Sequence, residues 1–163
     1  VAHPAVSDTG DGSYDISFTP LVVGPHELWV LTERGEHVVG SPIQLDVDPG
    51  RAVVDRCVAA GPGLSEGVAD TVCEFFIKAR DLCGNLSASG IDNFAVSMEG
   101  PPVMALGGMA AKCDITLEAV SGEMGTFRCT YTPQFAGHYK ITVRQAKSHI
   151  TGSPFVARVS AAD

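Results

Sequence analysis

The chain is poor in basic residues. Its 163 residues include 11 Lys and Arg against 19 Asp and Glu, which gives a formal net charge of −8. Binding to phosphates needs clustered Lys and Arg, so this composition argues against a nucleic-acid partner. The sequence also lacks a run of about 18 apolar residues, the length that predicts a membrane-spanning helix. We therefore expect protein partners, no nucleic acid and no membrane span in this chain.

The motifs of common catalytic and metal sites are missing as well. The five cysteines form no Cys-x-x-Cys pair, the spacing that is typical of a zinc site. Gly61-Pro-Gly63 lacks the Lys-Ser/Thr that follows the glycines of a phosphate-binding loop. No Ser-His-Asp order or paired-carboxylate motif stands out. The sequence predicts a protein that is not an enzyme and that holds no cofactor and no metal.

What the sequence does contain is one stretch in two copies. Residues 12–43 read GSYDISFTPLVVGPHELWVLTERGEHVVGSPI, and residues 125–155 read GTFRCTYTPQFAGHYKITVRQAKSHITGSPF. Pro20 aligns with Pro133 at an offset of 113 residues. After the loss of one residue, the Gly-Ser-Pro tripeptides align at an offset of 112. Two copies at this spacing indicate tandem modules rather than one large fold.

Each copy shows the alternation of half-buried strands. Phe127, Cys129 and Tyr131 alternate with polar residues, as do the matching residues of the first copy, and a proline then ends the run. A glycine turn and two further alternating runs follow, and Gly-Ser-Pro introduces the last of them. Short alternating runs separated by turn residues every 8–12 residues or so predict an antiparallel β-sandwich.

The combined pattern resembles the filamin-type immunoglobulin-like repeat. It consists of G-[ST]-[YF]-x-x-x-[YF]-T-P, then G-x-[YH]-x-[IL]-x-V, then H-[IV]-x-G-S-P, and it occurs in both copies. Residues 57–64 look like that family's first strand, and residues 75–101 look like its second and third. The resemblance implies an all-β fold of tandem antiparallel β-sandwiches, the first incomplete. It divides the chain into the C-terminal part of one repeat (residues 1–48), a short linker (49–52) and a complete repeat (53–160).

The first module has about 48 residues before the linker and nothing that resembles the family's first three strands. A half-sandwich of this size buries too little apolar surface to be stable alone. We therefore expect its missing strands to come from a preceding part of a longer protein, with a partner chain as the alternative source.

The resemblance also implies a way of binding partners. In filamin repeats a partner segment adds a strand beside the third strand, in the groove between the third and fourth strands. Carried over, the partner-binding groove lies between Ala95, Val96, Ser97, Met98 and Glu99 on one side and Asp114, Ile115, Thr116 and Leu117 on the other.

Residues 101–112, which join these two strands, are longer than is usual in the family. They add three apolar residues to the predicted site, Met104, Leu106 and Met109. The segment either folds back on the sandwich as a flexible loop or forms an adaptable apolar contact surface, since methionine suits irregular interfaces.

The cysteines leave two interpretations open. Cys57, Cys73, Cys113 and Cys129 fall on inward positions, and Cys83 falls in a turn. They are either small buried hydrophobes of a reduced protein or members of one or two disulfides in an extracellular module. Asn85-Leu-Ser87 is a glycosylation sequon and favours the extracellular interpretation.

We expect a non-catalytic structural and interaction module of a larger scaffold that is cytoplasmic and cytoskeletal. Its partners would be extended peptide segments or neighbouring repeats, with actin association through the parent protein. The alternative is a cell-surface adhesion module with disulfides and a glycan on Asn85.

Overall fold

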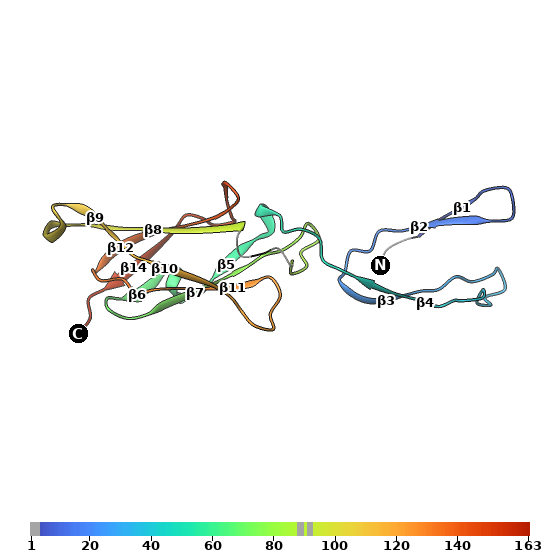
Figure 1. The fold of residues 1–163 in the computed structure, drawn as a ribbon, viewed down its shortest axis with the longest axis horizontal. Coiled ribbons are helices and arrows are strands. Elements are labelled where there is room, and N and C mark those ends of the chain that lie inside the picture. The colour runs from blue at the N-terminus through green and yellow to red at the C-terminus, as the bar shows by residue number, and fades with distance from the viewer. Residues whose placement is uncertain (1–3, 88–89, 91–92) are drawn as a thin grey trace. The chain divides into compact units, whose positions relative to one another are not determined.

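The chain divides into two units, Val1–Pro49 and Gly50–Asp163. A computed structural model describes residues 4–87, 90 and 93–163. The regular elements of these residues are strands and short 3₁₀ helices, so the expected all-β fold is confirmed (Figure 1). Among the described residues there is no helix of the length and hydropathy that a membrane crossing requires.

The second unit contains two packed sheets. One is antiparallel throughout, in the order β10 (Ile115–Ala119), β11 (Thr126–Tyr131), β7 (Cys73–Lys78) and β5 (Val58–Ala60). The other has the order β6 (Glu66–Val68), β14 (Phe155–Ser160), β12 (Gly137–Gln145), β8 (Phe94–Val103) and β9 (Met109–Lys112), and β13 (Ser148–His149) also pairs with β12. Two 3₁₀ turns, η1 (Val54–Arg56) and η2 (Pro62–Leu64), flank β5. The predicted β-sandwich is therefore present.

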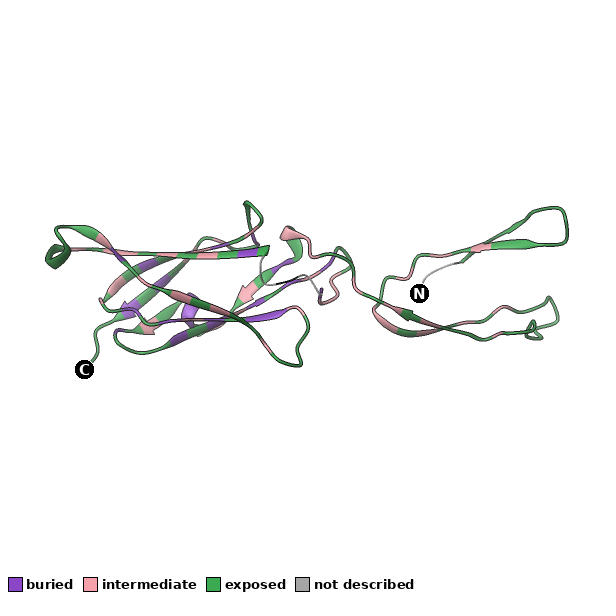
Figure 2. Ribbon diagram, viewed as in Figure 1, coloured by how far each residue is buried: buried purple, intermediate pink, exposed green. Residues whose placement is uncertain are grey.

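The core of this unit follows the predicted alternation. Phe75 and Ile77 of β7 face Ile141 and Val143 of β12, and all four are fully buried. Figure 2 shows the buried positions between the two sheets. Burying one such side chain contributes roughly 1.5–3 kcal/mol. Cys57, Cys73 and Cys129 are buried as expected, and Cys113 is half-buried. Cys83 lies in a turn, as predicted, and is exposed.

The first unit has two separate two-stranded sheets. β1 (Ala5–Asp8) pairs with β2 (Tyr14–Ser17), and β3 (Gly24–Leu28) pairs with β4 (Ile43–Val47), both antiparallel. None of its described residues is fully buried (Figure 2). The alternation that predicted these strands is correct, but the strands that cover the matching residues in the second unit have no counterpart among the described residues here.

The repeated His-x-x-Gly-Ser-Pro motif closes a loop in the same way in both units. The Val143 amide donates to Ser153 Oγ (2.9 Å), which also lies 2.9 Å from His149 Nδ1. In the first unit Val30, Ser41 and His37 repeat these two contacts, again at 2.9 Å each. Both Ser-Pro bonds are cis. The motif therefore encodes a structural contact that recurs in both units.

Asp81 organises the turn after β7. Its Oδ1 accepts hydrogen bonds from the amides of Cys83 (3.0 Å) and Asn85 (2.9 Å), and its Oδ2 accepts from the Gly50 amide (3.0 Å). The Asn85 side chain also donates to this carboxylate. These bonds, that of the Asn85 side chain first, hold the pKa of Asp81 below its usual value, because they stabilise the ionised form.

Tyr131 tests the inward phase of β11. Its side chain is 2% exposed, and its hydroxyl donates to the Gly63 carbonyl of η2. Tyr131→Ala should cost about 3–5 kcal/mol in the free energy of unfolding, measured by chemical denaturation, because it leaves a large cavity. Tyr131→Phe keeps the ring and should cost about 1–3 kcal/mol, the penalty of an unpaired buried carbonyl. A loss below about 1 kcal/mol for Tyr131→Ala would contradict the assigned packing.

The contribution of the Asp81 carboxylate to the turn can be measured from the pH dependence of stability. Because its folded pKa is depressed, its stabilising effect is complete above the unfolded pKa of about 3.9 and is lost as the pH falls through the folded pKa. Asp81→Asn should therefore lower the Tm of the second unit at pH 7, and the gap to the unmodified chain should narrow below about pH 4. Asp55→Asn, an exposed acid of η1, serves as the control. A gap that stays constant with pH would show that the carboxylate charge contributes nothing.

Candidate partner-binding groove

One side of β8 carries a strand only along part of its length. Along one edge of β8, residues 94–99 pair with β12, from Phe94↔Gln145 to Glu99↔Lys140. Along the opposite edge, β9 pairs with Glu99, Pro102 and Val103. Residues 94–98 have no strand on that side in the described part of the chain. Their outward backbone groups form an open sheet edge.

A hollow of about 560 Å³ adjoins this open edge. Val96 and Met98 are half-buried and point between the sheets, where Ile115 of β10 is half-buried opposite them. The hollow is lined by Val96, Ser97, Met98, Glu99, Ala110, Lys112, Cys113, Asp114, Ile115, Lys140 and Thr142. The groove thus joins an open backbone edge to an apolar floor.

The hollow brings together six of the twelve residues predicted for this site, and the three predicted hairpin residues Met104, Leu106 and Met109 lie outside it. Val96, Ser97, Met98, Glu99, Asp114 and Ile115 all line the hollow, whereas Ala95, Thr116 and Leu117 do not. Sequence reasoning missed five lining residues, Ala110, Lys112, Cys113, Lys140 and Thr142. Of these, Lys140 and Thr142 belong to β12 and pair with Glu99 and Ser97 of β8. The outward phase of Lys140 and Thr142 on an alternating strand is visible in the sequence, but the register that sets them beside β8 is not.

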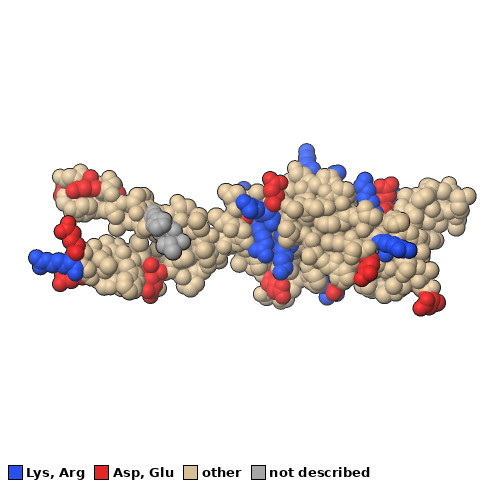
Figure 3. Space-filling model, turned by 180° about the vertical axis from the view of Figure 1, so that it is seen from behind, with Lys and Arg blue, Asp and Glu red and all other residues tan. Residues whose placement is uncertain are grey.

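The charges around the groove are mixed. Glu99 and Asp114 are acidic, and Lys112 and Lys140 are basic. The ion pair found among the described residues joins Arg128 to Glu74 on the other sheet at 3.6 Å, so these four charges have no ion-pair partner in that part of the chain. On the face drawn in Figure 3, acidic and basic side chains are likewise interspersed over the second unit. The groove therefore has no single-sign field that would select a highly charged partner.

The one thiol in the groove is suited to packing rather than to chemistry. Burial raises the pKa of Cys113, and its Sγ donates to the Thr132 carbonyl at 3.2 Å. A thiol that stays protonated is a poor nucleophile and a poor metal ligand. Among the described residues, no cluster of three or more His, Cys, Asp or Glu is arranged to hold a metal ion.

Residues 101–112 form an ordered hairpin that extends β8. The turn is η4 (Met104–Leu106), and β9 returns along β8 with a register shift between Glu99 and Pro102. Met104 is 89% exposed and Met109 is 68% exposed, and Leu106 is also exposed. The expectation that this segment folds back on the sandwich is therefore wrong for its tip, and an exposed apolar surface is what the structure contains.

The base of the hairpin is packed into the unit. Ala111 is 1% exposed and belongs to a small apolar cluster with Ala69, Tyr139 and Val159. Gly100 is required there, because a Cβ at this position would lie 2.5 Å from Cε1 of the Tyr139 ring. The hairpin thus has a fixed base and an apolar tip.

The predicted glycosylation sequon lies in the turn that Asp81 organises. The Asn85 side chain donates to the Asp81 carboxylate at 3.0 Å, and Ser87 is buried with its hydroxyl donating to the Gly50 carbonyl at 2.7 Å. Both polar side chains of the sequon therefore have structural roles in the turn.

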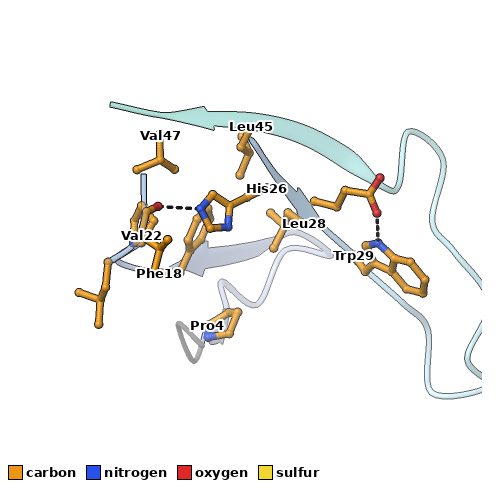
Figure 4. Close-up of a pocket in the computed structure, with 11 residues that line it drawn as sticks. Pro4, Phe18, Val22, His26, Leu28, Trp29, Leu45 and Val47 are labelled. Carbon is orange, nitrogen blue, oxygen red and sulfur yellow. Dashed lines mark hydrogen bonds between the residues drawn. The ribbon is translucent and has the colours of Figure 1, made fainter. Parts of the chain in front are cut away.

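The first unit carries its own hollow, of about 500 Å³, which is lined mainly by the segment between β2 and β3 and by residues of β3 and β4 (Figure 4). Phe18, Leu28 and Leu45 line it, and the His26 ring N–H donates to the Val22 carbonyl at 2.7 Å. Trp29 lies at its rim, where its indole donates to Glu27 (3.1 Å). Phe18, Leu28 and Leu45 align with the buried residues Tyr131, Ile141 and Ala157 of the second unit.

Comparison with known proteins agrees with this architecture. The family model described as Filamin/ABP280 repeat matches residues 1–44 and 51–156. Filamin-C of Mus musculus is 32% identical over 163 residues, which cover 99% of this chain and 5% of that protein. Filamin-A of Drosophila melanogaster is 32% identical over 161 residues, which cover 98% of this chain and 6% of that protein. The chain therefore spans only a small part of the length of these relatives.

A solved structure shares the fold. The crystal structure of the Lin-41 filamin domain superposes with a TM-score of 0.56 at 16% identity, and covers 68% of this chain and 98% of that chain. The two stretches matched by the family model also correspond to the two units seen here. The chain belongs to the filamin repeat family.

Proposed function

We propose that the second unit is an interaction module of a larger scaffold, and that it docks an extended segment of a partner protein as an added strand along β8. The observation that carries this proposal is the open edge at residues 94–98, which adjoins a hollow with an apolar floor. An incoming strand gains main-chain hydrogen bonds from such an edge, and pockets for its alternate side chains give specificity.

The side chains around the edge suit such a segment. Its inward residues would lie over Val96, Met98 and Ile115, and its outward residues would lie near Ser97 and Thr142. The matching partner chemistry is an alternation of apolar and small polar residues, because successive side chains of a strand point to opposite faces. Extended peptide segments and the edge strands of neighbouring repeats both meet this requirement.

The hairpin tip adds a second contact surface in this proposal. Met104, Leu106 and Met109 are exposed on one short turn, and no charged residue occurs between Glu99 and Lys112. Exposed apolar groups that are held on a fixed base are characteristic of interaction sites, and methionine adapts to irregular surfaces. A partner bound in the groove would meet this tip beyond β9.

Ile115 tests the groove. Peptides of about twelve residues, twice the length of a typical strand, would be selected from a random displayed library on the intact chain. Ile115→Lys places a charge on the apolar floor and should weaken binding of the selected peptides by about tenfold or more, or roughly 1.4 kcal/mol, as measured by fluorescence anisotropy.

The matched control is Thr116→Lys, which adds the same charge to the same strand on its exposed side. It should leave the affinity within about twofold of the unmodified chain. Circular dichroism establishes that both variants are folded. Undiminished binding by a folded Ile115→Lys chain would remove the groove from the function.

We propose that the first unit is the C-terminal part of a preceding repeat, at residues 1–48, joined through residues 49–52 to a complete repeat at 53–160. Two observations support this. Both units have the same Val-Ser-His contact. In addition, Phe18 and Leu28 of the first unit are partly exposed, whereas the aligned Tyr131 and Ile141 of the second unit are buried. Such tandem units would set the spacing between the other domains of the scaffold.

We further propose that the scaffold works in the reducing cytoplasm, as part of the cytoskeleton, with any link to actin made through the parent protein. All five cysteines are free thiols in the structure, and burial raises the pKa of Cys129 to about 12. Such a thiol is inert and packs as a small hydrophobe.

The compartment proposal is tested by the intact mass of the natively isolated protein. After unfolding without reductant, all five thiols should react with an alkylating agent, and no glycan mass should be present on Asn85. Cysteines that react only after reduction, together with added sugar mass, would instead favour the cell-surface adhesion module.

A further inference from the structure

One edge of β8 has a stretch that is paired with β9 and a stretch that is open. Beside Glu99, Pro102 and Val103 the edge is already occupied by β9. Beside residues 94–98 the edge is open among the described residues, and at residues 96–98 it adjoins the groove. A strand that docks in the groove would therefore lie in line with β9, as its continuation in the same sheet position.

The chain itself forms the wall between these two stretches. It leaves β9 at Lys112 and enters β10 at Ile115, and the residues in between line the groove. This crossing is fixed at both ends. Ala111 is buried in the cluster around Tyr139, and Cys113 Sγ donates to the Thr132 carbonyl. The crossing is thus held between two paired residues, Lys112 in β9 and Ile115 in β10, and is anchored by the Cys113 hydrogen bond.

We infer that the β8–β9 hairpin makes the groove a slot with one closed end, which limits a docked segment to pairing with the five residues 94–98. The segment has to end, or turn out of the sheet, where it reaches Lys112. This inference rests on the proposed function, and it specifies the partner: a short extended segment rather than a long edge strand.

The charged side chains at the closed end indicate which partner residues follow the segment that pairs with residues 94–98. Lys112 and Lys140 lie there with Glu99 and Asp114, and none of them has an ion-pair partner among the described residues. A polar turn of the partner can bond to either sign of charge, and glycine, asparagine or proline would carry the backbone out of the sheet. The partner therefore has an apolar alternation of about five residues flanked by a polar turn.

Peptide length is the property to measure. Peptides selected on the intact chain would be shortened to their minimal binding segment and then extended one residue at a time, at either end, with alternating Thr and Val. In the unmodified chain, extension at one end should stop raising the affinity once five residues are paired. In a variant with Gly and Ser in place of residues 103–110, each residue added at that end should raise it about threefold, because the edge is free.

Two further variants separate the possible causes. Ala110→Pro interrupts the β9 ladder with a single change, and it should also release the length limit if the larger replacement fails to fold. The triple variant Met104→Ser, Leu106→Ser and Met109→Ser removes the apolar tip but keeps the pairing, and should leave the length limit unchanged.

The outcomes are distinguishable from those of the groove proposal. If no selected peptide loses affinity on Ile115→Lys, the proposed function fails. If peptides depend on Ile115 but gain affinity beyond five residues at both ends in the unmodified chain, the closed end is overturned. The same holds if the limit persists when β9 is unpaired, because the hairpin would then not be its cause.

Discussion

Burial of alternate side chains between two sheets is the interaction on which the second unit depends. β7 and β11 supply Phe75, Ile77 and Tyr131 from one sheet, and β12 supplies Ile141 and Val143 from the other. Each element is short and would not persist alone in water. The sheets exist because each provides the apolar face that the other covers, and the groove is positioned by that contact.

The first unit shows what remains when half of this interaction is absent. Phe18 and Leu28 correspond to Tyr131 and Ile141, yet they stay partly exposed, whereas their counterparts are buried. The hydrogen bonds around Ser41 are nevertheless intact and match those around Ser153. Contacts within a loop form from local sequence, but burial requires strands that are distant in the sequence. Burial of one large apolar side chain contributes roughly 1.5–3 kcal/mol to stability, which is more than a typical single hydrogen bond contributes.

The inserted hairpin changes an edge that would otherwise be uniform. An open edge is a liability, because it pairs with any available strand. By carrying β9 back along β8 and packing Ala111 onto Tyr139, the chain covers one part of the edge and leaves the other part beside an apolar floor. The same segment exposes Met104 and Met109 at its tip. One hairpin thus both covers part of the β8 edge and exposes apolar side chains at its tip.

The sequence by itself determined the all-β class, the tandem copies and the inward phase of the strands, because alternation and turn residues act locally. The six predicted residues that line the groove were taken from the resemblance to the filamin repeat. The sequence did not reveal Lys140 and Thr142 in the groove, since their place beside Glu99 and Ser97 depends on the register between β8 and β12. The hairpin was also decided only in three dimensions. Pro-Pro and Gly-Gly interrupt any alternation in residues 101–112, and the return of β9 along β8 depends on the packing of Ala111 against Tyr139, a residue that is distant in the sequence.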